Sequence, residues 1–169
     1  MKIAVLDDWQ KNAHEFADWS RVGRKYQLDI YNDSISGSAL IERLREYDVI
    51  CAMRERTLLS AEVLDQLPNL KAIITSGMRN AAIDLDACKK LGINVSGTAS
   101  PGHATAELAM TLIGVLARQI VPSANAMTNG AWQVGTGRDL RGSRLGILGL
   151  GRLGSQVAKL GQAYGMEVQ

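Results

Sequence analysis

The sequence predicts an α/β protein built on a doubly wound parallel sheet. Short apolar runs recur along the chain between amphipathic segments. Several of these runs are apolar almost throughout, as strands buried on both faces should be. Their regular alternation with helical segments is typical of parallel sheets that carry helices on both faces. A glycine-rich turn, Gly149 to Gly154, opens a further strand–turn–helix unit near the end of the sequence.

The predicted strands of the first part are spaced evenly. They are Lys2–Leu6, Gln27–Tyr31, Asp48–Ala52, Lys71–Thr75 and Ile93–Val95. We expect them to form one small domain.

Helices are predicted between the strands from apolar stripes and end signals. Ser38–Arg45 places its leucines and isoleucine on one stripe. Ser60–Leu67 begins at an N-cap residue and stops at Pro68. Asp84–Leu91 begins at a capping aspartate and ends at Gly92, which suits the left-handed position after a helix.

The chain changes character after residue 97. A turn-rich connector leads into a long apolar helix, expected from His103 to about Gln119. Pro122 suits the first turn of a second helix that reaches Thr128, and residues 130–142 form a loop. We therefore expect a boundary near residue 99, with one domain at 1–99 and part of another at 100–169.

Composition narrows the class of protein. Hydrophobic residues make up 46% and charged residues 21% of the chain, and the net charge is +2. The basic residues are scattered, so nucleic-acid binding is not expected. The apolar stretch 108–121 is interrupted by polar residues, so a membrane span is not expected either. Cys51 and Cys88 are isolated in sequence and are predicted to be buried, reduced thiols of a cytoplasmic protein.

The turn from Gly149 to Gly154 has the spacing of a dinucleotide-binding fingerprint. Gly149 permits the tight turn, Gly151 lets a pyrophosphate approach the backbone, and Gly154 allows close helix–strand packing. The helix that follows would offer free amides to the phosphates, including those of Arg152 and Leu153. The acidic residue that would bind the ribose is expected about 20 residues further on. The sequence thus predicts NAD or NADP as cofactor without choosing between them.

Several segments of the chain, in their order, resemble the N-terminal half of proteins of the D-isomer-specific 2-hydroxyacid dehydrogenase family. The matching segments are Leu70–Ile74, Ser76-Gly77, Ile83–Leu85, Leu91–Val95, Ala106-Glu107, Gly130–Trp132 and Leu140–Ile147, followed by the glycine turn. The resemblance implies a flavodoxin-like substrate domain followed by the first βαβ unit of a Rossmann nucleotide-binding domain. It also implies hydride transfer between the nicotinamide and a small 2-hydroxy or 2-oxo acid.

The resemblance also implies substrate-binding residues. Backbone amides of Ser76, Gly77 and Met78 would hold the substrate carboxylate, in a loop whose small residues suit an anion. The family pattern is broken at Arg79, which either assists an anionic substrate or faces solvent. Arg54 follows the third strand and either recognises substrate or pairs with a surface glutamate.

Further roles are limited by the length of the chain. Thr105 matches a position near the nicotinamide in the family, although an early-helix threonine can also bond its own backbone. In the family, the catalytic histidine, arginine and glutamate lie beyond the matched half, so neither His14 nor His103 is assigned proton transfer. No catalytic residue and no metal site is predicted in this chain.

Two interpretations of function remain open. The first is an oxidoreductase of which this chain is a truncated part, inactive alone. The alternative is a non-enzymatic, nucleotide-binding or corepressor-like module of the same fold. In either case the apolar segment within residues 103–140 predicts a homo-oligomer, or contact with a missing C-terminal half.

Overall fold

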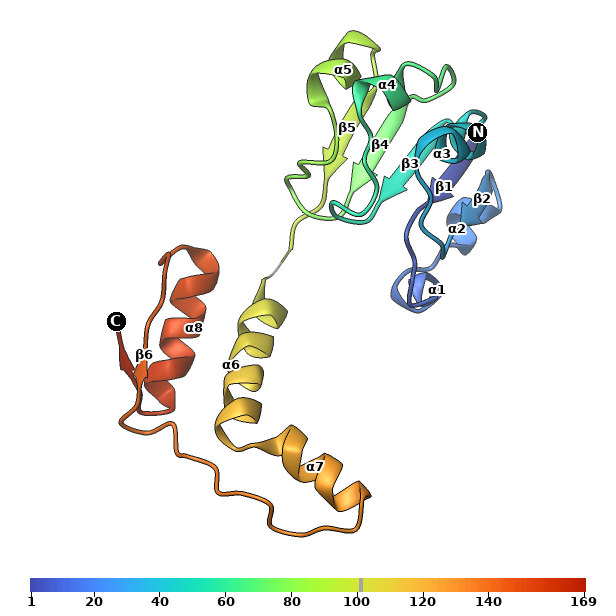
Figure 1. Ribbon diagram of the computed structural model, residues 1–169. Coiled ribbons are helices and arrows are strands. Elements are labelled where there is room, and N and C mark those ends of the chain that lie inside the picture. The colour runs from blue at the N-terminus through green and yellow to red at the C-terminus, as the bar shows by residue number, and fades with distance from the viewer. Residues whose placement is uncertain (101) are drawn as a thin grey trace. The chain divides into compact units, whose positions relative to one another are not determined.

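The computed structural model describes residues 1–100 and 102–169. It divides the chain into two compact units, Met1–Ser100 and Pro101–Gln169 (Figure 1).

The first unit is built on a parallel sheet. Its strands are β1 (Lys2–Val5), β2 (Gln27–Ile30), β3 (Val49–Ala52), β4 (Ala72–Thr75) and β5 (Asn94–Gly97). Their order across the sheet is β2-β1-β3-β4-β5, and every neighbouring pair is parallel. This order is that of a flavodoxin-like doubly wound sheet, which confirms the predicted fold class.

Of the three helices that the sequence predicts in the first unit, one has the predicted length and two are shorter. They are α1 (Ala13–Phe16), α2 (Ser20–Gly23), α3 (Gly37–Leu44), α4 (Ala61–Leu64) and α5 (Leu85–Lys90). Helix α4 ends three residues before the predicted end at Leu67, and turns continue to Pro68. The capping signals of α5 are confirmed: the Asp84 carboxylate accepts the Ala87 N–H at 2.9 Å, and Gly92 has φ +73°.

The core lies between the sheet and helices α3, α4 and α5. Leu44, Leu64 and Cys88 from the helices pack with Ile50 and Ile73 from the strands, and all are almost fully buried. Burial of a leucine or isoleucine stabilises the fold by roughly 2 kcal/mol, so these contacts dominate the first unit.

The other face of the sheet is covered less completely by the described residues. Ile74 is 41% exposed, and Cys51 is only partly buried. The expectation that both cysteines are buried is therefore wrong for Cys51, although both thiols are free. Burial raises the pKa of Cys51, and burial together with Asp84 raises that of Cys88, so both favour the unreactive protonated form.

The second unit contains a βαβ unit packed on a long helix. Its elements are α6 (His103–Ala117), α7 (Ile120–Thr128), β6 (Arg144–Leu145), α8 (Arg152–Ala163) and β7 (Glu167–Val168). Strands β6 and β7 are parallel, and α8 packs against α6. Helix α8 begins at Arg152, directly after the glycine turn, and this strand–turn–helix–strand order confirms the predicted βαβ unit.

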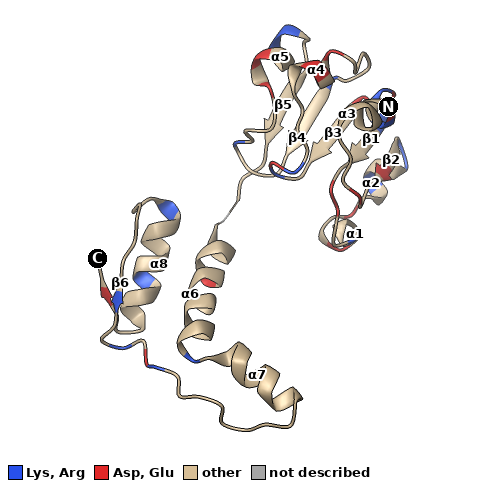
Figure 2. Ribbon diagram, in the orientation of Figure 1, with Lys and Arg blue, Asp and Glu red and all other residues tan. Residues whose placement is uncertain are grey.

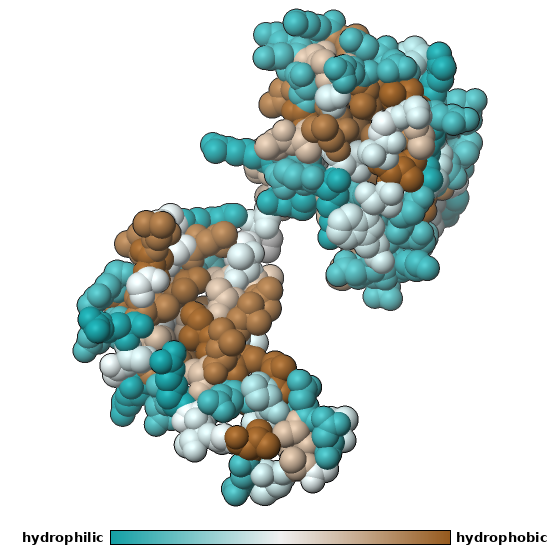
Figure 3. All heavy atoms as spheres, viewed as in Figure 1, coloured by the Kyte–Doolittle hydropathy of each residue, from teal (hydrophilic) through white to brown (hydrophobic). Residues whose placement is uncertain are grey.

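An apolar stripe on α6 is exposed within this unit. Leu108, Leu112 and Leu116 recur at intervals of one helical turn, and each is more than half exposed. Ile120, the first residue of α7, is also more than half exposed. Figure 3 shows apolar residues gathered over this part of the chain. No single described helix is long and apolar enough to cross a membrane; α6 and α7 reach that length and composition only together, across a 62° bend.

Candidate functional site

Loops from neighbouring strands meet at the carboxyl edge of the parallel sheet. Residues 53–57 follow β3, residues 76–80 follow β4, and Thr98 follows β5. Figure 2 shows basic residues in the loops at this end of the sheet. Open α/β sheets bind ligands at this edge, so the predicted substrate residues lie where a ligand would be expected.

Arg54 is held at both ends of its backbone by the loop after β4. Its N–H donates to Ser76 Oγ at 3.0 Å, and its carbonyl accepts from Asn80 Nδ2 at 2.6 Å. The residue adopts a left-handed conformation with φ +53°, which costs a non-glycine residue about 1 kcal/mol. The two hydrogen bonds hold this strained conformation.

The Arg54 side chain lies over Gly77. A Cβ built on Gly77 would overlap Arg54 Nη1, and Gly77 itself has φ +94°. The positive φ favours glycine here, because a side chain would be strained in this conformation whatever the space around it, while the Arg54 guanidinium occupies the position that a side chain would take. Arg54 also lies near the Glu55 carboxylate, with a nitrogen–oxygen distance of 3.7 Å. Because both side chains are about half exposed, this ion pair is weak.

Two of the three backbone amides predicted to hold an anion, those of Ser76 and Gly77, are hydrogen-bonded within the protein. Ser76 N–H donates to Ala52 O at 3.1 Å, which extends the β3–β4 ladder. Gly77 N–H donates to Thr98 Oγ1 at 3.1 Å. Within residues 1–100 and 102–169, the amide of Met78 makes no hydrogen bond, and its side chain is 72% exposed. Among the described residues, the amides of Arg79, Asn80 and Ala81 also make no hydrogen bond. The Met78 amide is thus one of several open donors after β4, and the Arg54 guanidinium from the loop after β3 adds a charged donor.

A second cluster ties the end of β1 to the loop after β3. Asp7 is 1% exposed and accepts a hydrogen bond from Thr57 Oγ1 at 2.7 Å. Arg56 donates to the Asp7 carbonyl at 2.7 Å and lies over the Trp9 ring, 4.1 Å from its centroid. The Arg56 side chain is therefore held by contacts within the protein. The other basic residues of loops 53–57 and 76–80 are Arg54 and Arg79.

A cavity of about 250 Å³ adjoins these loops. It is lined mainly by apolar side chains of β1, β3, β4 and the α1 region, with Cys51, Met53, Ser76 and Thr98 on its wall. Ser76 Oγ donates to Met53 Sδ at 3.3 Å, so the serine hydroxyl links the cavity wall to Arg54. The cavity has the size of a small organic molecule and few polar groups.

The glycine turn of the second unit has the geometry that its spacing predicts. Gly149 has φ +95°, and a Cβ built on Gly154 would overlap the Gly149 carbonyl oxygen. Helix α8 has Gly151 as its N-cap, a residue without a capping side chain. The amides of Leu153 and Gly154 in its first turn make no hydrogen bond to another described residue and are open to an external anion. Thr105 is exposed in the first turn of α6 in the same unit.

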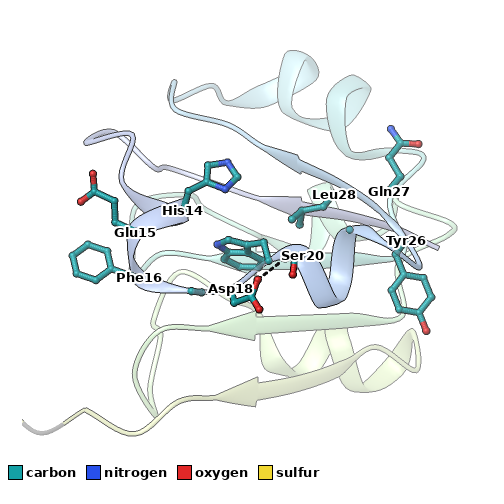
Figure 4. Close-up of a pocket in the computed structure, with 11 residues that line it drawn as sticks. His14, Glu15, Phe16, Asp18, Ser20, Tyr26, Gln27 and Leu28 are labelled. Carbon is teal, nitrogen blue, oxygen red and sulfur yellow. Dashed lines mark hydrogen bonds between the residues drawn. The ribbon is translucent and has the colours of Figure 1, made fainter.

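The two histidines lie in different units. His103 begins α6 and lines a hollow with Glu107 and with Gln156, Lys159 and Leu160 of α8. His14 lies in α1 and lines an open surface hollow formed by α1, α2 and the start of β2. Figure 4 shows His14 and Glu15 pointing in different directions, while Asp18 accepts a hydrogen bond from the Ser20 N–H at 3.0 Å. Neither histidine has a carboxylate bonded to it in the described residues, and these residues hold no cluster of metal ligands.

Sequence patterns did not single out Asn80 and Thr98, which both bond to the predicted site. Asn80 donates to Thr75 Oγ1 at 2.8 Å as well as to Arg54, and its Oδ1 accepts the Ala82 N–H at 2.9 Å. Thr98 directly follows β5 and accepts the Gly77 N–H. Both are ordinary polar loop residues, and the bonds that tie them to the site, Asn80 to Arg54 and Thr98 to Gly77, reach into other loops, so no local motif marks them.

Comparison with known proteins places this geometry in a family. Residues 3–167 match the family model described as "D-isomer specific 2-hydroxyacid dehydrogenase, catalytic domain". A hydroxypyruvate reductase of Thermotoga maritima is 32% identical over 99% of this chain and 54% of its own length. D-3-phosphoglycerate dehydrogenase 1 of Saccharomyces cerevisiae is 31% identical over 99% of this chain and 35% of its own length.

Solved structures agree in fold. A phosphoglycerate oxidoreductase of Vibrio cholerae superposes with a TM-score of 0.90 and 36% identity, over 99% of this chain and 55% of that one. The chain thus spans about half the length of several relatives that it matches. The strand order, the glycine turn and the match across nearly the whole chain lead to one conclusion: this chain belongs to the D-isomer-specific 2-hydroxyacid dehydrogenase family.

Proposed function

We propose that the chain is the substrate-binding part, with the first cofactor-binding turn, of an NAD(P)-dependent oxidoreductase that interconverts a small 2-oxo acid and its 2-hydroxy acid. The observation that carries this proposal is the Arg54 guanidinium over Gly77, at the carboxyl edge of the sheet in a chain of this family. A cation beside a free backbone amide suits a carboxylate.

Each candidate residue has a distinct role in this proposal. Arg54 donates to the substrate carboxylate, and the Met78 amide supplies a second donor. Gly77 contributes its lack of a side chain, which leaves room for the guanidinium. The Ser76 hydroxyl holds the Arg54 backbone and faces the adjoining cavity, where a short apolar substituent of the substrate would lie.

The second unit fits NAD or NADP. The amides in the first turn of α8 would donate hydrogen bonds to the pyrophosphate, and Gly149, Gly151 and Gly154 would keep side chains away from it. Arg152, Leu153 and Thr105 would lie near the bound nucleotide. When bound, the nicotinamide supplies the hydride chemistry, and this chain contributes binding and orientation.

We further propose that the chain works with additional protein. Its relatives extend well beyond the matched half, and the family's proton-transfer residues are expected there. Exposed apolar side chains on α6 and at the start of α7 support either a homo-oligomer through residues 103–140 or contact with a C-terminal half. They are Leu108, Leu112, Leu116 and Ile120. The 169-residue chain alone is expected to be inactive.

A complementation assay tests this function. The purified chain is mixed or co-expressed with the C-terminal half of the Thermotoga maritima relative, and NADH oxidation is measured with glyoxylate or hydroxypyruvate. We expect no turnover by the chain alone and turnover by the pair, weakened by Arg54→Ala. Tight NADH binding by the pair with no turnover of any 2-oxo acid would instead favour a non-enzymatic binding module.

A further inference from the structure

The side chain of Asn80 joins three parts of the site. Its Nδ2 donates to the carbonyl of Arg54 at 2.6 Å and to Thr75 Oγ1 at 2.8 Å, and its Oδ1 accepts the Ala82 N–H at 2.9 Å. It therefore connects the loop after β3, the end of β4 and its own loop. Both amide hydrogens and one acceptor lone pair are used, so its orientation is fixed.

We propose that Asn80 is a positioning residue, which holds Arg54 in the conformation that places the guanidinium over Gly77. This inference rests on the proposed binding of a 2-oxo acid by Arg54. Asn80 itself does not touch the substrate in this proposal. It acts through the Arg54 backbone.

Arg54 has a left-handed backbone conformation that is unfavourable for a residue with a side chain. An isolated arginine avoids φ +53°, so the loop returns to a more extended form unless other contacts hold it. Asn80 holds the carbonyl of this residue, and Ser76 holds its N–H. Loss of the Asn80 bond leaves only one of these two contacts. The Cβ of Arg54 then changes direction, and the guanidinium leaves the space that Gly77 provides.

The exposure of Arg54 makes this positioning necessary. Its side chain is 57% exposed, and its pairing with Glu55 spans 3.7 Å through a single contact. Neither feature fixes the orientation of a long, flexible side chain, because an exposed ion pair contributes little. The backbone hydrogen bonds from the β4 loop are therefore the main restraint on where the guanidinium lies.

A double-mutant cycle on ligand binding tests the inference. Oxamate, an amide analogue of a 2-oxo acid, is titrated into the 169-residue chain at constant ionic strength, and affinity is read from amide NMR shifts. We expect Asn80→Ala to weaken oxamate binding roughly tenfold. In the Arg54→Ala background the same substitution is expected to change affinity by less than about twofold, because Asn80 acts only through Arg54.

Asn69→Ala is the matched control. Asn69 also donates its side-chain amide to a distant backbone carbonyl, that of Arg45, at 3.2 Å. Its loss removes one exposed side-chain hydrogen bond to a backbone carbonyl, away from the site. It should lower the unfolding temperature less than Asn80→Ala, which loses three hydrogen bonds, and leave oxamate affinity unchanged. Equal loss of oxamate affinity in both asparagine variants, or additive effects in the cycle, would overturn the positioning role.

A ligand-free measurement separates this inference from the proposed function. The order parameter of the Arg54 backbone N–H bond is measured in wild type, Asn80→Ala and Asn69→Ala. We expect a restrained bond in wild type and Asn69→Ala and a mobile one in Asn80→Ala. If wild type binds no oxamate, the proposed function fails, and the order parameters alone decide the positioning role. An unchanged order parameter in Asn80→Ala refutes it.

Discussion

Gly97→Ala is expected to displace the loop that carries the candidate anion site. Gly97 ends β5, and a Cβ added there would lie 2.6 Å from the Gly77 carbonyl oxygen and 2.9 Å from Met78 Cα. Both neighbours are backbone atoms, so no side-chain rotation relieves the contact. To restore an ordinary separation of 3.4 Å, the loop must retreat by roughly 0.8 Å.

The magnitude follows from two opposing terms. Overpacking against backbone costs about 1–3 kcal/mol, whereas replacing a strand glycine with alanine gains about 0.5–1 kcal/mol. The net effect is a loss of about 1 kcal/mol in the free energy of unfolding. For a unit of this size, that lowers the unfolding temperature by about 4–8 °C. Oxamate affinity should fall as well, because the Met78 amide moves with the loop.

Thermal unfolding of the first unit, followed through NMR signals of its sheet amides, measures the effect. Ser96→Ala is the control, since Ser96 is an exposed neighbour in the same strand and its substitution is expected to be neutral within about 0.5 kcal/mol. If Gly97→Ala matched Ser96→Ala in unfolding temperature and in oxamate affinity, the close packing of Gly97 against the loop would be wrong.

Three further outcomes are expected. Hydrogen bonds from the Lys71 side chain and the Lys2 amide lower the pKa of Asp48, so Asp48→Asn should destabilise the chain at pH 6. In urea unfolding, the difference between wild type and variant should disappear as the pH falls through the lowered folded-state pKa. Gly154→Ala should speed hydrogen exchange in α8, because the new methyl group overlaps a backbone carbonyl. Gly161→Ala should slow it, because its methyl group meets the end of a leucine side chain and alanine has the better helix propensity. Equal effects of the two substitutions would contradict this packing. Leu112→Lys on the exposed stripe of α6 should convert a homo-oligomer to monomer in analytical ultracentrifugation, and an unchanged sedimentation profile would place the interface elsewhere.

The sequence predicted the elements whose signals are local. The strands of the first unit lie within the predicted runs, except that β5 extends two residues beyond its run. The central strands β1, β3 and β4 are largely buried, so their runs are mostly apolar, whereas the edge strands β2 and β5 are more exposed and include polar residues. Asp84 and Gly92 bound α5 as predicted, since a cap and its partners lie within one turn. Helices α1 and α2 of four residues each are too short to show a helical period, and the sequence did not separate them.

The polar contacts of the site could not be predicted in the same way. Arg54 is bonded to partners 22 and 26 residues away, and Thr57 reaches a carboxylate 50 residues away. Each such pair depends on strands brought together by the folded sheet. No residue type or spacing in a single loop specifies which distant carbonyl a side chain will meet. The resemblance therefore identified the loop, and only the structure identified Asn80.

Two glycines illustrate this difference. Gly154 leaves room for the carbonyl of Gly149, five positions earlier in the chain, so one short motif contains both partners. Gly77 leaves room for the guanidinium of Arg54, which arrives from another strand. The first constraint holds wherever the motif folds as a strand, turn and helix. The second holds only while Asn80 and Ser76 maintain the conformation of Arg54, so the cofactor turn should tolerate changes elsewhere in the chain better than the substrate loop does.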